Sequence, residues 1–289
     1  MTEKEPNLPD FGILKDLIGE WQGHGFNLIA LPNFDSRSPS TGPSDFRLKL
    51  NKTDETLKFT AMNEPIANRG ASAVQGETLI GQRDIYMAGI TYLQSIIEPL
   101  TKKGLHREDG ILLNVPATHV LPVQGQKIVR MGSIPHGSTF VLQSVKIETI
   151  EGPPTIPIID SMPTHIEFTP VGYLDEYINS KRPLGITQEM VLNPNLLLQK
   201  EITDQKIIKT IQITLSTRPL GGLTSIPFVV LNANPTDMSI TYWIETVERR
   251  DGSRFLQLQY SQNVNLNFLG IDWPHISVAT LIKQITSFL

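Results

Sequence analysis

The stretch Leu17-Ile-Gly-Glu-Trp-Gln-Gly-His-Gly-Phe26 opens the first strand predicted from the sequence, Glu20 to Leu31. Trp21, Gly23 and Gly25 alternate along it, so their positions share one face of the strand. Burying an indole removes on the order of 200 Å² from water, and the two glycines leave room beside it. The pattern predicts that Trp21 packs in the interior of the protein. Stacking on a ligand is the alternative role for this side chain.

Outward from this stretch, short runs of β-branched and aromatic residues alternate with turn residues, among them 21 glycines and 21 prolines. The run Asp84 to Ile97 is apolar on both faces, which predicts a strand covered on both sides. About ten to twelve strands without βαβ alternation favour a closed antiparallel up-and-down barrel, mainly all-β, with a few short helices. A β-sandwich with the same number of strands is the alternative. We expect residues 1–289 to form a single domain with a loop region around Glu151 to Thr187.

Local signals add turns and helices to this scheme. Asp109-Gly110 and Asp251-Gly252 supply the residues that tight hairpin turns need. Asn195 to Thr203 follows Asn-Pro, which predicts a helix. The last residues, 276–289, carry apolar side chains at helical spacing, which predicts a C-terminal helix packed on the barrel: Val278, Leu281, Ile282, Ile285 and Leu289.

Composition excludes several classes of function. The chain has 25 basic and 29 acidic residues, a net charge of −4 and no long basic run, so we expect no nucleic-acid partner. It has no cysteine, which excludes disulfides, thiol nucleophiles and thiolate metal sites. No stretch approaches the ~20 apolar residues of a membrane span, and the first residues lack the pattern of a signal peptide. We therefore expect a cytoplasmic protein.

Two short motifs resemble a known family. The pattern Gly19-x-Trp21-x-Gly23-x-Gly25 resembles the opening of calycin barrels, the superfamily of lipocalin-like and fatty-acid-binding-protein-like folds, and especially of the nitrobindin-like haem proteins. His106-Arg-Glu-Asp-Gly110 resembles a hairpin motif of the same group. The resemblance implies a barrel that holds an apolar ligand or haem. Nitrobindin-like proteins ligate haem through a histidine on a late strand. The predicted strand Arg254 to Phe268 has none, so the resemblance leaves the role of haem ligand to His275 or His136.

The histidines are the candidate catalytic and metal-ligating residues. The six histidines have no HxxxH, HxH or HExxH spacing, so a zinc site would need residues from distant segments. His136 lies in a Pro-His-Gly corner between two strands, where loops present functional groups. His106 and Glu108 share one face of a strand, which suits acid–base chemistry or haem ligation. A surface ion pair at that place, and structural roles for His136 and His275, are the alternatives.

Five further residues are candidate ligand-binding groups. Trp21 and Tyr92 lie on predicted strands, and Trp273 lies beside Pro274 and His275. Arg69 lies in a long connection, and its planar guanidinium suits a carboxylate-bearing ligand. The alternative is that Arg69 is a solvated loop residue. Asn263 belongs to a strand, Arg254 to Phe268, with only neutral amides and a hydroxyl on one face. This face either lines a hydrated lumen or is an outer face covered by the loop region or by a second subunit.

Three functions are consistent with these features. The first is binding of an apolar or amphipathic small molecule in the barrel cavity, as a carrier or as a cyclase- or isomerase-type enzyme that acts by enclosure. The second is a haem barrel with one axial histidine, with peroxidase-like or nitric-oxide-related chemistry. The third is an assembly protein that forms a homo-oligomer through the amide-rich strand.

Overall fold

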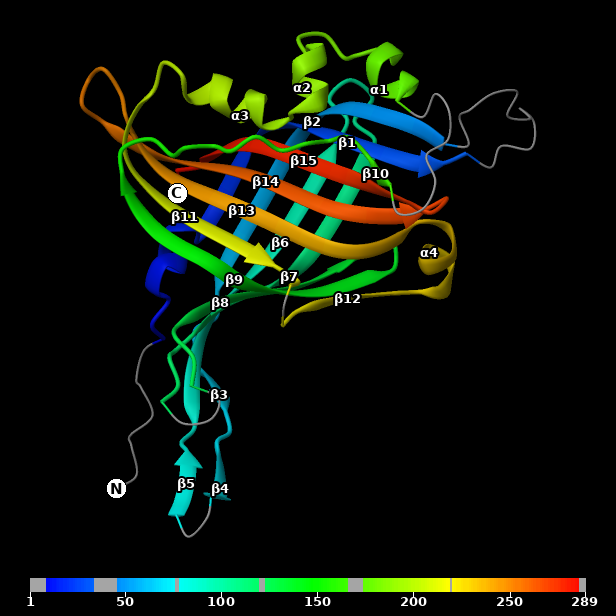
Figure 1. The fold of residues 1–289 in the computed structure, drawn as a ribbon. Coiled ribbons are helices and arrows are strands. Elements are labelled where there is room, and N and C mark those ends of the chain that lie inside the picture. The colour runs from blue at the N-terminus through cyan, green and yellow to red at the C-terminus, as the bar shows by residue number, and fades with distance from the viewer. Residues whose placement is uncertain are drawn as a thin grey trace.

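The computed structural model describes residues 9–33, 46–75, 78–119, 123–165, 174–218 and 220–285. Ten antiparallel strands follow one another around a barrel in the order of the chain, and pairing of the first with the last closes it (Figure 1). These strands are β1 (Gly19–Pro32), β2 (Phe46–Ala61), β6 (Ile85–Ile97), β7 (Gly104–Val115), β8 (Lys127–Ile134), β9 (Ser138–Glu151), β11 (Lys206–Ser216), β13 (Asn234–Glu248), β14 (Arg254–Phe268) and β15 (Ile271–Lys283). The prediction of a closed up-and-down barrel is confirmed.

Shorter elements decorate this barrel. At one end of the barrel lies η1 (Gly12–Asp16), and β10 (Thr164–His165) pairs with β15. Three short helices lie over β14, β15, β1 and β2: α1 (Asp175–Asn179), α2 (Gln188–Leu192) and α3 (Asn195–Ile202) (Figure 1). At the far end, β12 (Gly222–Ser225) pairs with β9 and precedes α4 (Pro227–Asn232). β3 (Ile66–Asn68) pairs with β6 and leads into a projecting arm, the hairpin of β4 (Ala71–Gln75) and β5 (Thr78–Gln82).

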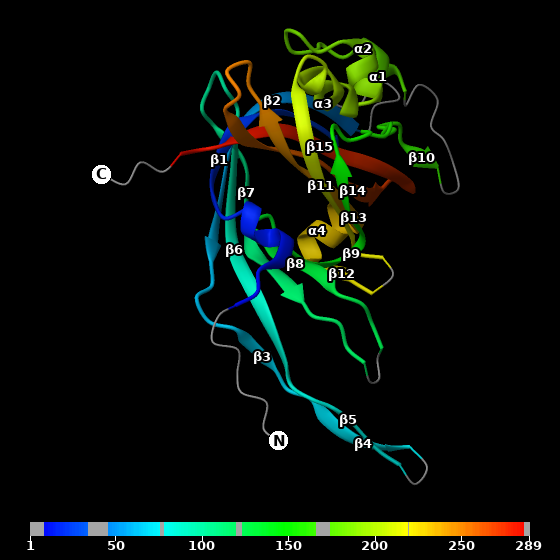
Figure 2. The ribbon, with the colours of Figure 1, turned by 90° about the vertical axis from the view of Figure 1, so that its left-hand side faces the viewer.

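The end of the barrel around η1 is closed by Trp21. The indole is fully buried, and its Nε1 donates to the carbonyl of Leu17 at 2.7 Å. Leu14 and Leu17 are fully buried beside it, and Figure 2 shows η1 at the centre of this end. The ammonium of Lys283 lies 5.4 Å from the centre of the Trp21 ring. The predicted packing role of Trp21 is therefore observed in the fold.

Gly23 and Gly25 share the inner face with Trp21 but leave little free room. A Cβ at Gly23 would lie 2.1 Å from the carbonyl oxygen of Thr280, and one at Gly25 would lie 2.2 Å from that of Val278. The backbone of β15 occupies the space that side chains would need. The two glycines therefore allow the strands to approach closely where the barrel closes.

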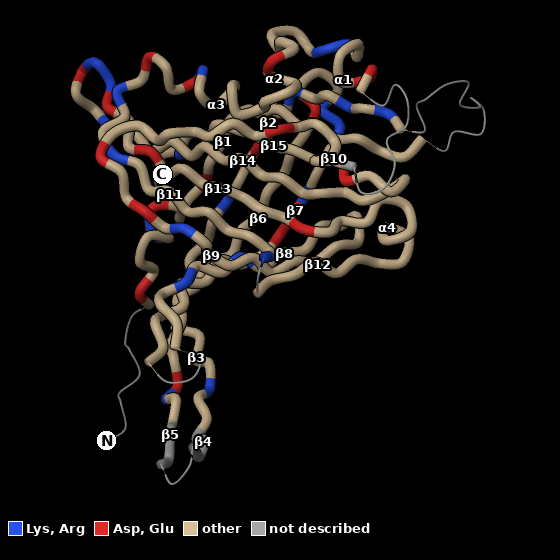
Figure 3. Tube along the Cα trace, viewed as in Figure 1, with Lys and Arg blue, Asp and Glu red and all other residues tan. Residues whose placement is uncertain are grey.

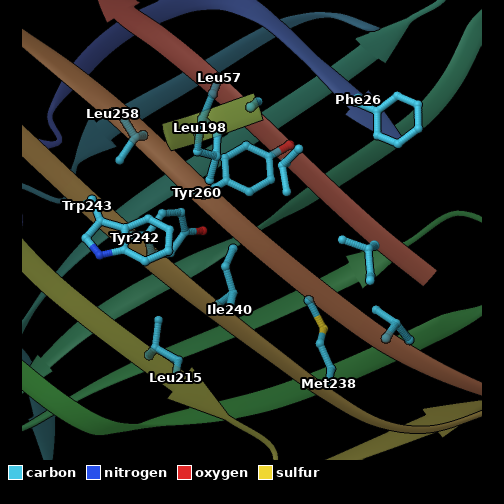
Figure 4. Close-up of a cluster of buried hydrophobic side chains, with 14 of the residues drawn as sticks. Phe26, Leu57, Leu198, Leu215, Met238, Ile240, Tyr242, Trp243, Leu258 and Tyr260 are labelled. Atoms are coloured by element: carbon cyan, nitrogen blue, oxygen red, sulfur yellow. The ribbon is translucent and has the colours of Figure 1, made fainter. Parts of the chain in front are cut away.

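The interior of the barrel is filled by side chains of alternate residues on every strand. A buried aromatic and aliphatic cluster includes Leu215, Met238, Ile240, Tyr242, Leu258 and Tyr260 (Figure 4). Burial of these side chains contributes about 25 cal/mol per Å² of apolar area. A second cluster, of Met87, Leu113 and Val115, lies on the outer side of β6 and β7. The wall formed by these strands is thus apolar on both faces, but its outer face is only partly covered, since Leu93 of β6 is 36% exposed; the prediction of a strand covered on both sides holds for the inner face alone.

Two predictions about local structure are wrong. The C-terminal helix is instead strand β15, whose hydrogen bonds to both β1 and β14 complete the barrel; residues 286–289 lie outside the described part of the chain. Pairing on both sides outweighed the helical spacing of its apolar residues. Asp109-Gly110 forms no turn, because β7 runs unbroken through it. The hairpin at Asp251-Gly252 is confirmed, with Gly252 at φ +82°.

The predicted helix Asn195 to Thr203 is confirmed as α3, which ends one residue earlier. Its N-cap is Pro194, while the side chain of Asn193 accepts a hydrogen bond from the backbone of Ile159 at 3.1 Å. The loop region predicted around Glu151 to Thr187 is the start of the segment that carries the three helices. Among the described residues, no helix is long and apolar enough to cross a membrane.

Candidate functional site

Three histidines from distant parts of the chain come together at the end of the barrel opposite Trp21. His106 is on β7, His136 is in the β8–β9 turn and His275 is on β15. The ring centroids of His106 and His136 are 6.0 Å apart. Both rings are near enough to His275 to lower its pKa. We call this part of the molecule the histidine end. The sequence analysis singled out each histidine but did not predict that they meet.

His275 faces the interior from the last strand of the barrel. Its Nε2 lies 2.8 Å from the side-chain Nδ2 of Asn27, which also donates to Ser277 Oγ at 2.8 Å. Burial, together with His106 and His136, lowers the pKa of His275 to about 3. The ring is therefore neutral at physiological pH. Because Nε2 accepts from Asn27, the ring proton is assigned to Nδ1.

His136 is held in place by the backbone of its turn. Gly137 has φ +111°, a conformation that favours glycine, and its N–H donates to the carbonyl of Ile134 at 2.9 Å. The carbonyl of Gly137 accepts from the backbone of Ile226, just before α4. Burial, and then His106, lower the pKa of His136. The Pro-His-Gly corner thus presents a neutral imidazole at the rim.

His106 and Glu108 point inward from the same face of β7, as their spacing predicts. His106 Nε2 lies 3.4 Å from Glu108 Oε2, and Glu108 is fully buried. Burial raises the pKa of this carboxyl, but Arg130 and His106 outweigh that effect and lower the pKa to about 2. The contact with this carboxylate fixes the orientation of the His106 imidazole. The surface ion pair considered as an alternative is not what the structure shows.

Arg130 of β8 lies behind this pair in the middle of the barrel. Its guanidinium donates to Glu108, to the hydroxyl of Tyr92 at 3.1 Å and to Gln262 Oε1 at 3.0 Å. The rings of Tyr92, Phe140 and Tyr242 surround it at 5.2, 5.2 and 5.8 Å. Burial disfavours the charged guanidinium, but Glu108 outweighs this and raises its pKa. The positive charge is therefore balanced inside the protein, and it is not free for an anionic ligand.

A second buried carboxyl, Glu55 of β2, lies beside this network. Tyr260 donates to it at 2.6 Å, Thr53 at 2.8 Å and Gln94 at 3.3 Å. Burial raises its pKa, and these hydrogen bonds reverse only part of the rise. Arg130 and the ionised Glu108 thus offset each other in this core, and Glu55 adds a further buried polar group. The inner surface that faces the histidines is therefore polar.

The structure places the remaining predicted site residues as follows. Tyr92 belongs to the central network, where its hydroxyl donates to Glu108 at 2.5 Å. Trp21 pairs with Lys283 at the end of β15, eight residues along that strand from His275. Trp273 packs on Phe46 and Phe268, with ring centroids 4.3 and 5.1 Å away. It shares β15 with His275 but lies in this separate aromatic group.

Arg69 and Asn263 lie apart from the histidines. Arg69 is at the base of the arm, outside the barrel, and its Nη1 donates to Asp84 at 2.5 Å. Asn263 is on the outer face of β14, since Tyr260 and Gln262 of that strand point inward. The helical segment covers this amide face: Gln259 donates to the carbonyl of Leu198 in α3, and Gln257 pairs with Gln205. The outer-face interpretation is therefore the correct one, although the cover comes from α3 and Gln205 and not from the predicted loop region Glu151 to Thr187.

Sequence reasoning missed Arg130, Glu55, Tyr242 and Tyr260. One signal for Arg130 is present: it is the only charged residue in the run Ile128 to Ile134, at a position that alternation places with Ile128 and Ile134. Its partner Glu108 is far away in the chain, so the pair is visible only once β7 and β8 are aligned. Among the described residues, no group of three or more His, Cys, Asp or Glu side chains is arranged to hold a metal ion.

The fold and site define a closed ten-stranded antiparallel barrel with a charge-balanced polar core and a histidine end. This architecture is consistent with a calycin-like barrel. No family model and no curated protein matches the chain. Among solved structures, it is similar to the crystal structure of Rv2717c from M. tuberculosis, with 16% identity, coverage of 94% of this chain and 96% of that chain, and a TM-score of 0.44.

Proposed function

We propose that this protein binds an amphipathic small molecule at the histidine end, with the polar group of the ligand against His106, His136 and His275. The observation that carries the proposal is the convergence of these three side chains from β7, the β8–β9 turn and β15. A barrel fold is compatible with small-molecule binding. Convergent polar groups beside apolar side chains are the usual means of orienting a ligand.

Apolar surface adjoins the imidazoles. The strand register aligns Met238 of β13 with Val264 of β14, and Val264 with His275 of β15. Residues in register share one face of the sheet, so the two apolar side chains and the imidazole form one inward row. This row suits a ligand that has an apolar body next to a hydrogen-bonding group.

The charges of the site favour a neutral polar group on the ligand. His275 and His136 have lowered pKa values, and Arg130 is balanced by Glu108. A carboxylate or phosphate would find no unbalanced positive charge among these residues. A carrier needs only such binding. An isomerase- or cyclase-type enzyme would in addition use His106, held by Glu108, as its acid–base group.

A fluorescence titration with the uncharged amphipathic dye N-phenyl-1-naphthylamine tests this proposal. We expect saturable binding by the native protein and at least tenfold weaker binding by His136→Leu and by His275→Leu. His119→Leu is the matched control, because His119 is exposed in the loop after β7. Unchanged binding in both variants, or no binding by the native protein, would contradict the proposal. Circular dichroism verifies that each variant is folded.

Haem is a second candidate ligand, favoured by the position of His275. The family resemblance implies a haem-ligating histidine on a late strand, and the predicted strand Arg254 to Phe268 contains none. However, the last strand of the barrel is β15, and it carries His275 with a neutral ring that faces inward. The residues fit a haem in this respect. They fit less well in another, because His275 Nε2 is engaged by Asn27.

Titration with haemin separates the two candidates. Haem ligation predicts a Soret band that is retained in His119→Leu and lost in His275→Leu. No Soret shift in the native protein would exclude haem and leave the proposal of an amphipathic ligand standing. If haem bound here, His275 would hold it, and the haem would supply redox or gas-binding chemistry.

A further inference from the structure

The arm and the wall next to it are two features that the proposed function does not use. The arm is the hairpin of β4 and β5, which forms a two-stranded sheet of its own and projects away from the barrel (Figures 1 and 2). The wall is the outer face of β6 to β9. Within the described part of the chain, no other element packs on the hairpin or covers this wall. Both features lie on the same side of the molecule.

The arm needs a surface to pack on. An isolated two-stranded hairpin is marginally stable in water, because it has no apolar face to bury. The register aligns Ala73 with Ile80 and Val74 with Leu79, so apolar residue types stand opposite each other along it. Residues 71–82 contain only one charged residue, Glu77. Such a sequence suits contact with an apolar surface rather than full exposure.

The base of the arm fixes its direction. Asp84 accepts a hydrogen bond from the backbone N–H of Gly70 at 2.9 Å and one from Arg69 at 2.5 Å. A Cβ at Gly70 would lie 1.8 Å from the carbonyl oxygen of Gln82, so the two chains cross closely there. The hydrogen bond from Gly70, followed by that from Arg69, lowers the pKa of Asp84. Asp84 is therefore ionised while it binds Gly70 and Arg69, and these contacts fix the direction of the arm.

The wall offers a matching groove. A hollow of about 810 Å³ lies over β6 to β9. Its lining combines apolar side chains with polar ones: Ile111, Met131, Val141 and Leu220 with Thr91, Asp109, Ser133 and Thr139. Ile111 and Met131 also belong to the outer hydrophobic cluster of Met87, Leu113 and Val115, so groove and cluster are continuous. Leu220 is 73% exposed. The neighbouring β12 and α4 carry no charged residue (Figure 3).

We infer that the arm of one chain lies in the groove of a second copy, and that the exchange is reciprocal. The arm and the groove are adjacent on one face. A two-fold axis beside them would therefore place each arm in the groove of the other copy. Outer-face positions in a water-soluble barrel are normally polar, and the run of apolar residues on β6 to β8 is then explained by this contact. The occupant of the groove is thus a second copy of this chain.

Size-exclusion chromatography with light scattering tests the assembly. We expect a dimer of about 64 kDa, twice the 32.2 kDa of one chain, at micromolar concentration. Replacing residues 73–80 by Asn-Gly, and separately Met131→Glu, should each give a monomer. Leu184→Glu is the control, because Leu184 is 93% exposed before α2 and away from the arm. A monomeric native protein, or a dimer that persists in both variants, would overturn the inference.

The absence of cysteine allows a second test that does not depend on stability. Thr78→Cys places one thiol on the arm, and Ser133→Cys places one in the groove. Mixing the two proteins under oxidising conditions should give a cross-linked pair, whereas Thr78→Cys mixed with Ser253→Cys, on the β13–β14 hairpin, should not. Equal cross-linking in both mixtures would contradict reciprocal exchange. Circular dichroism of each variant separates loss of the dimer from loss of the fold.

Discussion

Arg130 and Glu108 form an ion pair between adjacent strands β8 and β7, and both side chains are fully buried in the middle of the barrel. Their charges cancel, and the aromatic rings of Tyr92, Phe140 and Tyr242 enclose the guanidinium. Because Glu108 also contacts His106, this pair connects the packed core to the histidine end.

Replacing Arg130 by methionine should strongly destabilise the protein. The change leaves Glu108 as an unpaired charge in the core, which typically costs about 3–5 kcal/mol. The double variant Arg130→Met/Glu108→Gln should recover much of the loss, because it removes the uncompensated charge. Urea unfolding of the three proteins measures this difference. Equal stability of the single and double variants would show that the pair is not coupled.

Acid should destabilise the protein through His275. Its pKa is about 3 in the folded state against about 6.5 in the unfolded chain, so below pH 6.5 the unfolded state binds more protons. Stability from this group is present above pH 6.5 and is lost as the pH falls towards 3. Between pH 7 and pH 5, the free energy of unfolding of His275→Gln should therefore fall by about 2 kcal/mol less than that of the native protein. Unfolding at both pH values, with His119→Gln as the control, measures the effect.

Glu245 should have the opposite dependence on pH. Burial on the outer side of β13 raises its pKa to about 8, although Gln257 donates to it at 2.7 Å. Between pH 4.5 and pH 8 the folded state holds a proton that the unfolded state has lost, so stability falls as the pH rises through this window. Glu245→Gln should raise Tm by about 10 °C at pH 8 and have little effect at pH 4.5. A rise of the same size at both pH values would contradict this cause.

The glycines after Trp21 should tolerate no side chain. Gly23→Ala places a Cβ against the backbone of β15, and overpacking of this kind costs about 1–3 kcal/mol. Gly104→Ala is the matched control, since a Cβ there would meet nothing within 4 Å. A Tm for Gly23→Ala as high as that of Gly104→Ala would show that β15 can move aside.

Much of the barrel could be predicted from the sequence, because alternation along strands and turn residues between them are local signals. The closing strand could not. Residues 276–282 place apolar side chains at helical spacing, and only the pairing of β15 with both β1 and β14 makes them a strand. Gly110 was likewise expected in a turn; instead it lies in a strand, where a Cβ would be 2.1 Å from the carbonyl oxygen of Met131.

The sequence indicated which residues belong to the candidate site, but it did not indicate that they lie close together in the fold. The spacing of His106 and Glu108 gave their shared face, and the Pro-His-Gly corner gave the turn that holds His136. That His275 joins them depends on the closure of the barrel. That Glu108 is balanced by Arg130 depends on the register of β7 with β8.

Native mass spectrometry of freshly purified protein tests the binding role of the histidine end most directly. The account predicts a non-covalent small molecule on the native protein and on His119→Leu, with its occupancy lost in His136→Leu and His275→Leu. A native protein that carries no ligand from cells or after incubation with N-phenyl-1-naphthylamine would contradict it. So would an adduct of equal occupancy in all four proteins, because the ligand would then bind away from the histidines.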